Sequence, residues 1–276
     1  VINGLMSRDD WQLAIKLPVG CLPGGSGNAL CCAINYSAGE PVLHNLLLHS
    51  TFILIKHRVI PMDLVLIQTP TERLYSFLSV SWGIIADIDL ESEKYRSIGE
   101  ARFTFGALKR IIEMNVKKET EFLTAAAEEN EIQIEQEVTV ATKILGQPVP
   151  APLLTSLDQP VPDNWISFED DFVTITAVYQ THLGSDMLAS PESRINDGFI
   201  YLIIIRSGIS RNALLSLFMS FDEGKHVDSP DVEIIRCLAF RMEPKEGNIM
   251  VDGEHIDLSP IQGQVLPGLS RLMAIQ

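Results

Sequence analysis

The sequence predicts an α/β layer in residues 1–60, followed by a β-rich domain that begins at residue 61. Two observations support this expectation. Helix-like and strand-like patterns alternate in residues 1–60, which is typical of an α/β layer. After Pro61, most apolar runs are short and are bounded by proline, glycine or aspartate, as β-strands are.

Four segments make up the first part. Residues 9–17 begin with two aspartates and then space apolar residues as a short amphipathic helix does. Residues 19–22 predict a short buried strand, and residues 28–39 predict a helix that a glycine ends. Residues 43–55 predict a helical start followed by a β-branched, aromatic strand.

The second part contains six strand-like stretches, two helix-like stretches and one insertion. The insertion, 116–165, is acidic and then proline-rich, and it predicts a loop or a partly disordered segment. The helix-like stretches are 91–115 and 210–221. The strand-like stretches are 62–70, 73–83, 170–181, 198–207, 234–244 and 248–258.

The composition excludes several classes of protein. A net charge of −15 argues against a general nucleic-acid binder, which needs a basic surface. The four cysteines form no C-x-x-C pair and are not spaced with the histidines as metal ligands are, so they predict reduced thiols in a cytoplasmic protein. No apolar run approaches the roughly 20 residues of a membrane-spanning helix.

The stretch "LPGGSGN" (22–28) allows three interpretations. It is a strand-to-helix corner, in which glycines permit a sharp turn and Ser26 or Asn28 caps the helix. A hydrolase nucleophile turn with Ser26 exposed is the second interpretation, but residue 28 is not the glycine that this motif requires.

The third interpretation is a phosphate cradle. The backbone N–H groups of Gly25, Ser26 and Gly27 at a helix N-terminus suit an anion. The stretch is neither a Walker A loop nor a Rossmann fingerprint, because the required lysine and glycine spacing are missing. The local pattern does not separate the cradle from the corner.

Longer stretches carry a family resemblance. "LPGGSGNAL" (22–30) resembles the nucleotide loop of the diacylglycerol kinase-like lipid kinases. Four further stretches resemble the sphingosine kinase family within that superfamily. They are 81–106, 181–187, 206–218 and 250–257, in the same order as in the family.

The resemblance implies an α/β nucleotide-binding domain in 1–60, to which 265–276 returns, and a β-sandwich lipid-binding domain in 61–264. ATP would bind in the cleft between them. The insertion at 116–165 matches nothing in the family.

The resemblance also assigns residues to ATP and Mg²⁺. Guanidinium groups neutralise a transferred phosphoryl group, whereas nearby glutamates allow a solvated helix face instead. The Asp-Gly pair near the C-terminus equally predicts a hairpin turn. The assigned ATP-binding residues are Gly25, Ser26, Gly27, Arg96, Arg102, Asp252, Gly253 and Glu254, and the residues that would hold the metal stay unknown.

For the lipid, Asp89 matches the family's substrate-recognition aspartate. A carboxylate can pair with the amine of sphingosine and accept from its hydroxyl groups. The alternative is that Asp87 or Asp89 caps the following helix. The tail channel would involve Ile84, Phe103, Ala107, His182 and Met187, for which core packing is the equal alternative.

Residues 103–114 form an amphipathic pattern with Phe105, Leu108, Ile111 and Ile112 as apolar positions. The resemblance implies a lid that touches membranes, with Lys109 and Arg110 toward lipid headgroups, and a calmodulin-like partner at the same segment. Core packing explains this pattern as well. The expected location is therefore cytoplasmic, with reversible association to membranes.

The implied function is ATP-dependent phosphorylation of the primary hydroxyl of sphingosine and related sphingoid bases. The alternatives are a ceramide or diacylglycerol kinase, and a non-catalytic lipid-binding module. The family's "Ser-Gly-Asp-Gly" motif, which carries its catalytic aspartate, does not occur in the sequence. We therefore assign no catalytic residue. We expect a truncated fragment, and little or no kinase activity in phosphate-transfer assays of the 276 residues alone.

Overall fold

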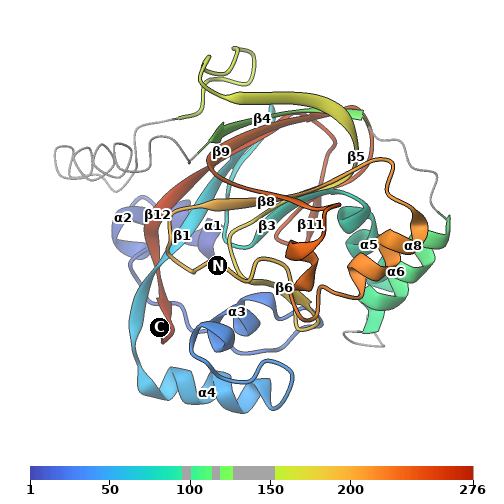
Figure 1. The fold of residues 1–276 in the computed structure, drawn as a ribbon. Coiled ribbons are helices and arrows are strands. Elements are labelled where there is room, and N and C mark those ends of the chain that lie inside the picture. The colour runs from blue at the N-terminus through green and yellow to red at the C-terminus, as the bar shows by residue number, and fades with distance from the viewer. Residues whose placement is uncertain (95–100, 114–118, 127–152, 276) are drawn as a thin grey trace.

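The computed structural model describes residues 1–94, 101–113, 119–126 and 153–275 (Figure 1). In this part of the chain the long strands form one antiparallel sheet with the order β11–β10–β3–β5–β4–β9–β12–β1–β2, and β8 pairs with both β5 and β9. β4 and β8 lie end to end between β5 and β9. A small hairpin, β6–β7, stands apart from this sheet.

The six strand-like stretches are all confirmed. The strands are β1 (Val59–Gln68), β2 (Arg73–Ser76), β3 (Ser79–Gly83), β4 (Glu119–Ala126), β5 (Ile166–Val178), β6 (His182–Gly184), β7 (Met187–Leu188), β8 (Ile200–Arg206), β9 (Glu233–Pro244), β10 (Ile249–Val251), β11 (Glu254–Ile256) and β12 (Ile261–Met273).

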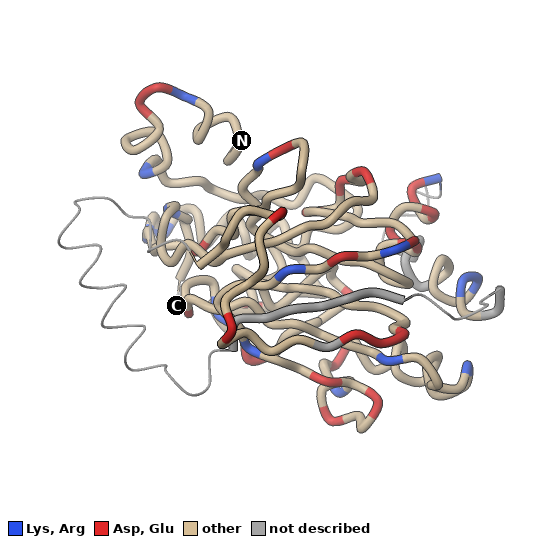
Figure 2. Tube along the Cα trace, turned by 90° about the horizontal axis from the view of Figure 1, so that it is seen from above, with Lys and Arg blue, Asp and Glu red and all other residues tan. Residues whose placement is uncertain are grey.

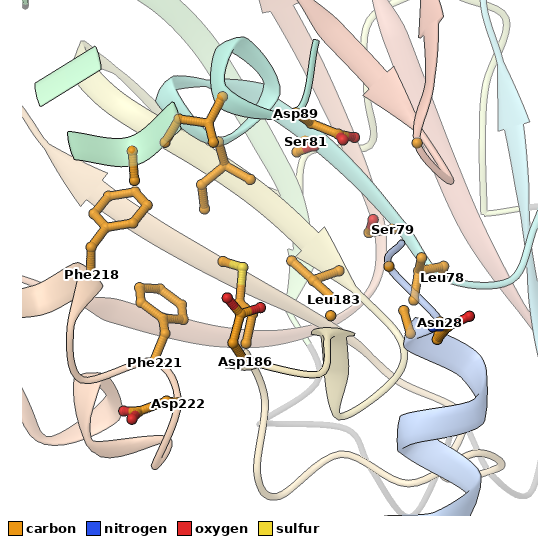
Figure 3. A pocket seen from close by; sticks show the side chains of 18 of the residues that line it. Asn28, Leu78, Ser79, Ser81, Asp89, Leu183, Asp186, Phe218, Phe221 and Asp222 are labelled. Atoms are coloured by element: carbon orange, nitrogen blue, oxygen red, sulfur yellow. The ribbon is translucent and has the colours of Figure 1, made fainter. Parts of the chain in front are cut away.

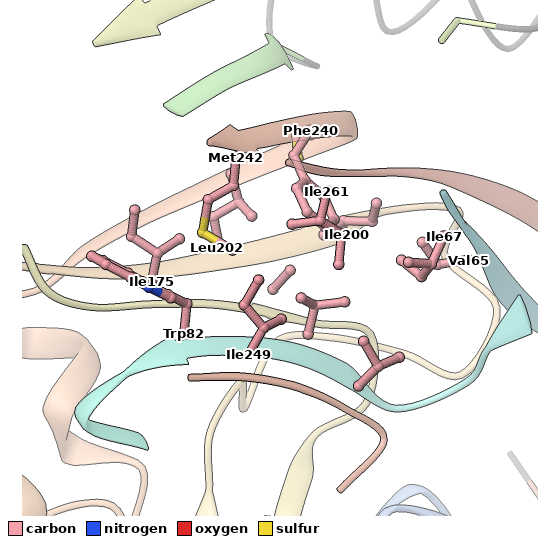
Figure 4. Packing of buried hydrophobic residues seen from close by; sticks show 14 of the residues in the cluster. Val65, Ile67, Trp82, Ile175, Ile200, Leu202, Phe240, Met242, Ile249 and Ile261 are labelled. Carbon is pink, nitrogen blue, oxygen red and sulfur yellow. The ribbon is translucent and has the colours of Figure 1, made fainter. Parts of the chain in front are cut away.

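A buried apolar cluster fills the inside of the curled sheet. It joins strands from opposite ends of the strand order, so the two halves of the sheet face each other (Figure 4). Burying large side chains such as Trp82 and Phe240 stabilises the fold by roughly 2–3 kcal/mol each. Other members are Val65, Ile67, Ile175, Ile200, Leu202, Met242, Ile249 and Ile261.

Four helices precede the sheet: α1 (Ile2–Met6), α2 (Trp11–Ala14), α3 (Ala29–Ser37) and α4 (Leu46–Lys56). The helices expected in 9–17 and 28–39 are confirmed. The strand expected at the end of 43–55 is wrong, because α4 is helical throughout. Its buried residues face α3, where Asn35 donates to Ser50 at 2.8 Å, and this packing overrides the β-branched composition.

The strand expected at 19–22 is also wrong. Val19 forms an isolated parallel bridge to Leu272, with Val19 N–H donating to Arg271 O and Met273 N–H donating to Val19 O, both at 2.9 Å. Residues 20–22 pair with no strand in the described part of the chain. This bridge holds the chain against the end of β12, just before residues 22–28, which we call the glycine loop.

β1 and β12 connect the helices to the sheet. Their pairing runs from Val59–Met273 to Gln68–Gln262, with one irregularity near Asp63. Buried Asp63 accepts hydrogen bonds from Gly198 N–H at 2.7 Å and Gly268 N–H at 2.6 Å. Burial raises the pKa of Asp63 to about 6, and these two bonds oppose the rise.

Three further helices cover the outer face of β5 and β8: α5 (Ile84–Ser92), α6 (Ala101–Glu113) and α8 (Arg211–Phe218) (Figure 1). A 3₁₀ turn, η2 (Lys225–Asp228), follows α8. The helix-like stretch 210–221 is confirmed by α8. The stretch 91–115 is confirmed in part: α6 lies within it, residues 95–100 and 114–115 lie outside the described residues, and α5 ends at Ser92 but begins earlier than expected. Gly83 makes this start possible: its φ is +86°, and a Cβ there would lie 2.4 Å from the carbonyl oxygen of Val173.

The expectation of a loop at 116–165 is wrong for 119–126, which form strand β4, and is confirmed for 153–165, which form no helix or strand. β4 adds to both β5 and β9, and Arg241 holds the stretch 153–165. The buried Arg241 guanidinium donates to the carbonyl oxygens of Gln159 at 2.7 Å and Ser156 at 3.2 Å, and to Gln262 Oε1. Residues 127–152 lie outside the described residues.

Charged residues are distributed over the whole described chain. Figure 2 shows Lys and Arg interspersed with Asp and Glu rather than gathered on one face. The exposed ion pairs, such as Arg206 with Asp170 and Glu233, contribute little to stability because solvent screens them.

Candidate functional site

A cavity of about 410 Å³ lies where α5, α6, α8 and the β6–β7 hairpin meet the glycine loop and the β10–β11 turn (Figure 3). Four α-helices, α3, α5, α6 and α8, contribute to its wall, together with β3, the β6–β7 hairpin and the neighbouring turns and loops. Residues far apart in the sequence, such as Gly27, Asp89 and Gly253, therefore line one space.

One end of the cavity is apolar. Figure 3 shows Phe218 and Phe221 together at this end, away from Asn28 and Ser79. Such a lining suits a hydrocarbon chain, because it removes apolar surface from water. The apolar residues are Ile85 and Ile88 from α5, Ala107 and Leu108 from α6, Leu215 and Phe218 from α8, and Leu183, Met187, Met219 and Phe221.

Polar side chains line the rest of the cavity and also stand at the apolar end, where Figure 3 shows Asp222 beside Phe221. The charge of the lining has one sign. Five carboxylates line the cavity, and no lysine, arginine or histidine does so among the described residues. The cavity wall therefore favours a positively charged group. The carboxylates belong to Asp89, Glu93, Asp186, Asp222 and Asp252.

The side chain of Asn28, the last residue of the glycine loop, forms hydrogen bonds with the backbone of the same loop. Asn28 Oδ1 accepts from the N–H groups of Gly24 at 3.1 Å and Gly25 at 3.0 Å, and Asn28 Nδ2 donates to Gly25 O at 2.8 Å. Of the predicted phosphate donors, Gly25 thus donates within the chain, and Gly27 lines the cavity. Ser26 has no histidine partner in the described part of the chain, so nothing there activates it as a nucleophile.

The glycines of this loop are not needed for its backbone. Gly24, Gly25 and Gly27 have no positive φ, whereas Asn28 does, at 51°. A Cβ at Gly24 or Gly27 would meet no atom within 4 Å, and one at Gly25 would meet Asn28 Oδ1 at 3.8 Å. The missing side chains therefore leave open space over the loop, as a close approach by a ligand requires.

The start of α3 is uncapped. Asn28 is its N-cap residue, but neither it nor Ser26 forms the expected side-chain cap, because the Asn28 side chain turns back to the loop. The first intrahelical bond runs from Cys32 N–H to Asn28 O, so the preceding N–H groups have no partner within the helix. Gly27, Asn28 and Ala29 line the cavity, which places this positive helix end at its edge.

Asp252 is a structural residue of the cavity wall. Its carboxylate accepts from Ser76 Oγ at 2.6 Å and from the N–H groups of Phe77 and Ser79 at 3.1 Å and Leu78 at 3.0 Å. Burial raises the pKa of Asp252, and the four hydrogen bonds oppose the rise. The carboxylate thus ties the β10–β11 turn to the segment before β3.

The other two residues of the predicted "DGE" group differ in position. Gly253 lines the cavity with φ +84°, and a Cβ there would lie 3.8 Å from Asp89 Oδ2. Glu254 is exposed and outside the cavity lining. The hairpin-turn interpretation is confirmed, since β10 and β11 pair on either side of the turn.

Asp87 and Asp89 do not cap α5, because both lie inside it. Asp89 lines the cavity, whereas Asp87 is 2% exposed at its side chain and holds two neighbours. Arg110 donates to Asp87 at 2.6 Å, and Asn248 donates to it at 2.8 Å. The expectation that Arg110 faces lipid headgroups is therefore wrong. Arg110 connects α6 to α5 through its ion pairs with Asp87 and Glu91.

Of the predicted tail-channel residues, Ala107 and Met187 line the cavity, but Ile84 and His182 do not. Ile84 packs in the apolar cluster beneath α5, so core packing describes it. His182 is buried, its Nδ1 is 2.8 Å from Thr181 Oγ1, and its ring meets Tyr36 edge-on at 5.2 Å. Burial lowers the pKa of His182 to about 4.

Three predicted residues cannot be placed in the site. Arg96 lies outside the described residues, and the side chains of Arg102 and Phe103 lie outside them as well. Their roles stay predictions. Among the described residues no group of three or more histidine, cysteine or acidic side chains could hold a metal ion.

Sequence reasoning missed the cavity residues of α8 and the segment after it. Leu215, Phe218 and Phe221 come from the stretch predicted as a helix, and its apolar spacing was the available signal. Asp186 and Asp222 gave no signal, because isolated aspartates beside turns are ordinary.

Comparisons with known proteins agree with this arrangement. Residues 158–274 match the model of the YegS C-terminal NAD kinase beta sandwich-like domain. A diacylglycerol kinase from Bacillus anthracis has a similar fold, with a TM-score of 0.56 at 16% identity over 92% of this chain and 68% of that one. A second chain from that bacterium reaches a TM-score of 0.61 at 16% identity over 99% of this chain and 73% of that one. The fold is thus diacylglycerol kinase-like.

The sequence relatives are more specific. Mouse sphingosine kinase 1 is 40% identical over 97% of this chain and 70% of its own length, and the human protein of that name is 39% identical with the same coverage. Sphingosine kinase 1 of Arabidopsis thaliana is 34% identical over 92% of this chain and 53% of its own length. The fold and these relatives define a lipid kinase. The chain belongs to the sphingosine kinase family.

None of the described helices is both long and apolar enough to cross a membrane.

The Asp252 contacts predict a large loss of stability on truncation. Asp252→Ala leaves one hydroxyl and three N–H groups without their acceptor, so the free energy of unfolding should fall by about 3 kcal/mol in urea titrations. Asp257→Ala, at an exposed position of the same hairpin region, is the control and should change it by less than about 0.5 kcal/mol. Equal stability of the two variants would contradict the structural role.

Buried His182 predicts a pH dependence of stability. Its pKa is about 4 in the folded protein and about 6.5 when unfolded, so the unfolded state takes up the proton first. The stabilisation is present above pH 6.5 and is lost as the pH falls toward 4, by about 3 kcal/mol in total. The difference in free energy of unfolding between wild type and His182→Gln should shrink accordingly in urea titrations across this range. A constant difference would show that His182 does not titrate in this way.

Proposed function

We propose that this lipid kinase transfers the γ-phosphoryl group of ATP to the primary hydroxyl of sphingosine or a related sphingoid base. The observation that carries the proposal is one cavity that combines a cluster of apolar side chains with several carboxylates and an uncapped helix N-terminus. A sphingoid base has a hydrocarbon tail, a charged amine and hydroxyl groups, and this lining can receive all three.

The carboxylates of the lining favour the amine. Asp89 is half-buried on α5 and lines the cavity close to Gly253, so it can pair with an ammonium group with little competition from water. Ceramide and diacylglycerol offer no positive charge, and they would leave the wall of carboxylates uncompensated. The names of the relatives, sphingosine kinases of mouse and human, point to the same substrate class.

The apolar end would hold the tail. Ala107 of α6 and Met187 of β7 take part in it, as the sequence predicts, together with the phenylalanines of α8 and of the segment after it. A tail enclosed between α5, α6 and α8 leaves the headgroup toward the glycine loop (Figure 3).

The glycine loop and the start of α3 would hold the phosphates of ATP. The open space over Gly24 and Gly27 and the unpartnered N–H groups of the first helical turn fit an anion. We further propose that ATP binds in a cleft between two parts of the chain. One side is formed by residues 1–60 together with 265–276, and the other by residues 61–264. Arg96 and Arg102 would add positive charge to balance the phosphates.

Magnesium would accompany the nucleotide and would neutralise its phosphate charge. Since the Asp252 carboxylate is already engaged by four hydrogen bonds, we assign the metal mainly to the phosphate oxygens rather than to Asp252. We assign no described side chain as the general base, because Asp89 binds the amine in this proposal.

Membrane association of the same region is part of the proposal. Phe105 and Leu108 on α6 are 50% and 40% exposed, and Met219 after α8 is 61% exposed. Leu108 and Met219 also line the cavity, so apolar side chains stand at its rim. A bilayer could cover them while a lipid enters. The calmodulin-like partner stays a prediction.

Phosphate transfer from labelled ATP tests the proposal, with the full product of the gene offered sphingosine, ceramide and diacylglycerol. We expect transfer to sphingosine. Asp89→Asn should lower its kcat/KM by about 30-fold or more, because a charge pair shielded from water is lost.

Asp257→Asn, exposed and outside the cavity, is the matched control and should leave the rate unchanged. Preferred transfer to ceramide or diacylglycerol would overturn the substrate assignment. Full activity of Asp89→Asn on sphingosine would overturn the role of Asp89.

A further inference from the structure

Two cysteines bracket the glycine loop. Cys21 directly precedes residues 22–28, and Cys31 lies in the first turn of α3. Their Sγ atoms are 3.0 Å apart, and both thiols are free. Because an S–S bond is about 2.05 Å long, the sulfur atoms need to approach by only about 1 Å to form one.

The two thiols differ in environment. Cys21 is partly exposed, whereas Cys31 is 2% exposed. A hydrogen bond with Cys31 lowers the pKa of Cys21, and the same contact together with burial raises the pKa of Cys31. Cys21 is therefore the thiol that an oxidant reaches and the one that ionises first, and Cys31 is positioned to resolve the product.

We propose that Cys21 and Cys31 are a hydroperoxide-sensitive pair that closes reversibly as a disulfide across the glycine loop. The Cys21 thiolate attacks a peroxide oxygen, the O–O bond breaks, and the leaving oxygen takes a proton to become water or an alcohol. Cys31 then attacks the Cys21 sulfenic acid. The S–S bond forms, the S–O bond breaks, and the hydroxide leaves as water with the proton of Cys31. Two thiols are oxidised and one hydroperoxide is reduced.

The disulfide would hold one conformation of the loop. The sulfur atoms meet in the conformation in which Asn28 accepts the N–H groups of Gly24 and Gly25. A bond between Cys21 and Cys31 encloses the whole loop and keeps these two donors turned toward Asn28. On the proposed function, on which this step rests, the oxidised protein has fewer donors for phosphate and binds ATP more weakly.

Treatment with hydrogen peroxide followed by peptide mapping in a mass spectrometer tests the site itself. We expect peptides joined through Cys21 and Cys31 with the loss of two hydrogen atoms, and dithiothreitol should reverse the change. Cys31→Ser should stop at a sulfenic acid on Cys21 that dimedone captures, and Cys21→Ser should form no disulfide.

Cys32→Ala is the matched control, because Cys32 is the fully buried neighbour of Cys31 and both members of the pair remain. It should form the disulfide at the wild-type rate. The absence of a disulfide in wild type, or its formation with Cys32 or Cys237 instead, would overturn the proposal. The wild-type map alone decides this even if a serine variant fails to fold.

ATP titration of the reduced and oxidised protein tests the consequence. We expect the Kd to rise about tenfold on oxidation, to recover with dithiothreitol, and to be insensitive to peroxide in Cys21→Ser. Unchanged affinity in a protein whose disulfide has been mapped would overturn the locking step. Failure of the reduced protein to bind ATP would count against the proposed function and not against the disulfide.

Discussion

The antiparallel pairing of β1 with β12 is the constraint on which the other parts of the structure depend. β1 follows the four N-terminal helices, and β12 is the last strand, so their ladder joins the two ends of the described chain. The bridge from Val19 to Leu272 then places the glycine loop relative to the sheet. A further buried apolar cluster packs side chains such as Ile15, Ile34 and Ile53 against Leu64 and Leu266. Without this ladder, α3 would have no fixed position beside the cavity.

The cavity itself depends on contacts between turns and helix ends. Asp252 fixes the β10–β11 turn to the segment before β3, and Arg110 fixes α6 to α5 through Asp87. Both carboxylates are engaged in hydrogen bonds within the protein, so they shape the wall. Asp87, which holds α6, and Asp89, which lines the cavity, thus stand two residues apart on α5.

The spacing of apolar residues and the turn-forming residues between them predicted most of the fold from the sequence. Most of the long strands after Pro61 combine β-branched residues with a bounding Pro, Gly or Asp, and these local signals predict them. They failed where partners from other parts of the chain decide: α4 is a helix because Ser50 and Ile53 face α3 and the core, and β4 is a strand because β5 and β9 leave room for it. In the site, the family resemblance located Asp89 and Gly253. The engagement of Asp252 and Arg110 depends on distant backbone groups and helices that no local pattern contains.

The charged side chains in the described lining of the cavity are all negative, and this affects how the product would leave. A sphingoid base would enter as a cation, and the proposed transfer would add a phosphate group of about −1.5 to −2 charges to it. The same carboxylates that attract the substrate would then repel the negative charge of the product, while the positive end of α3 and, in the proposed function, Arg96 and Arg102 would attract it. The balance of these opposite charges would set how fast the phosphorylated lipid leaves the cavity.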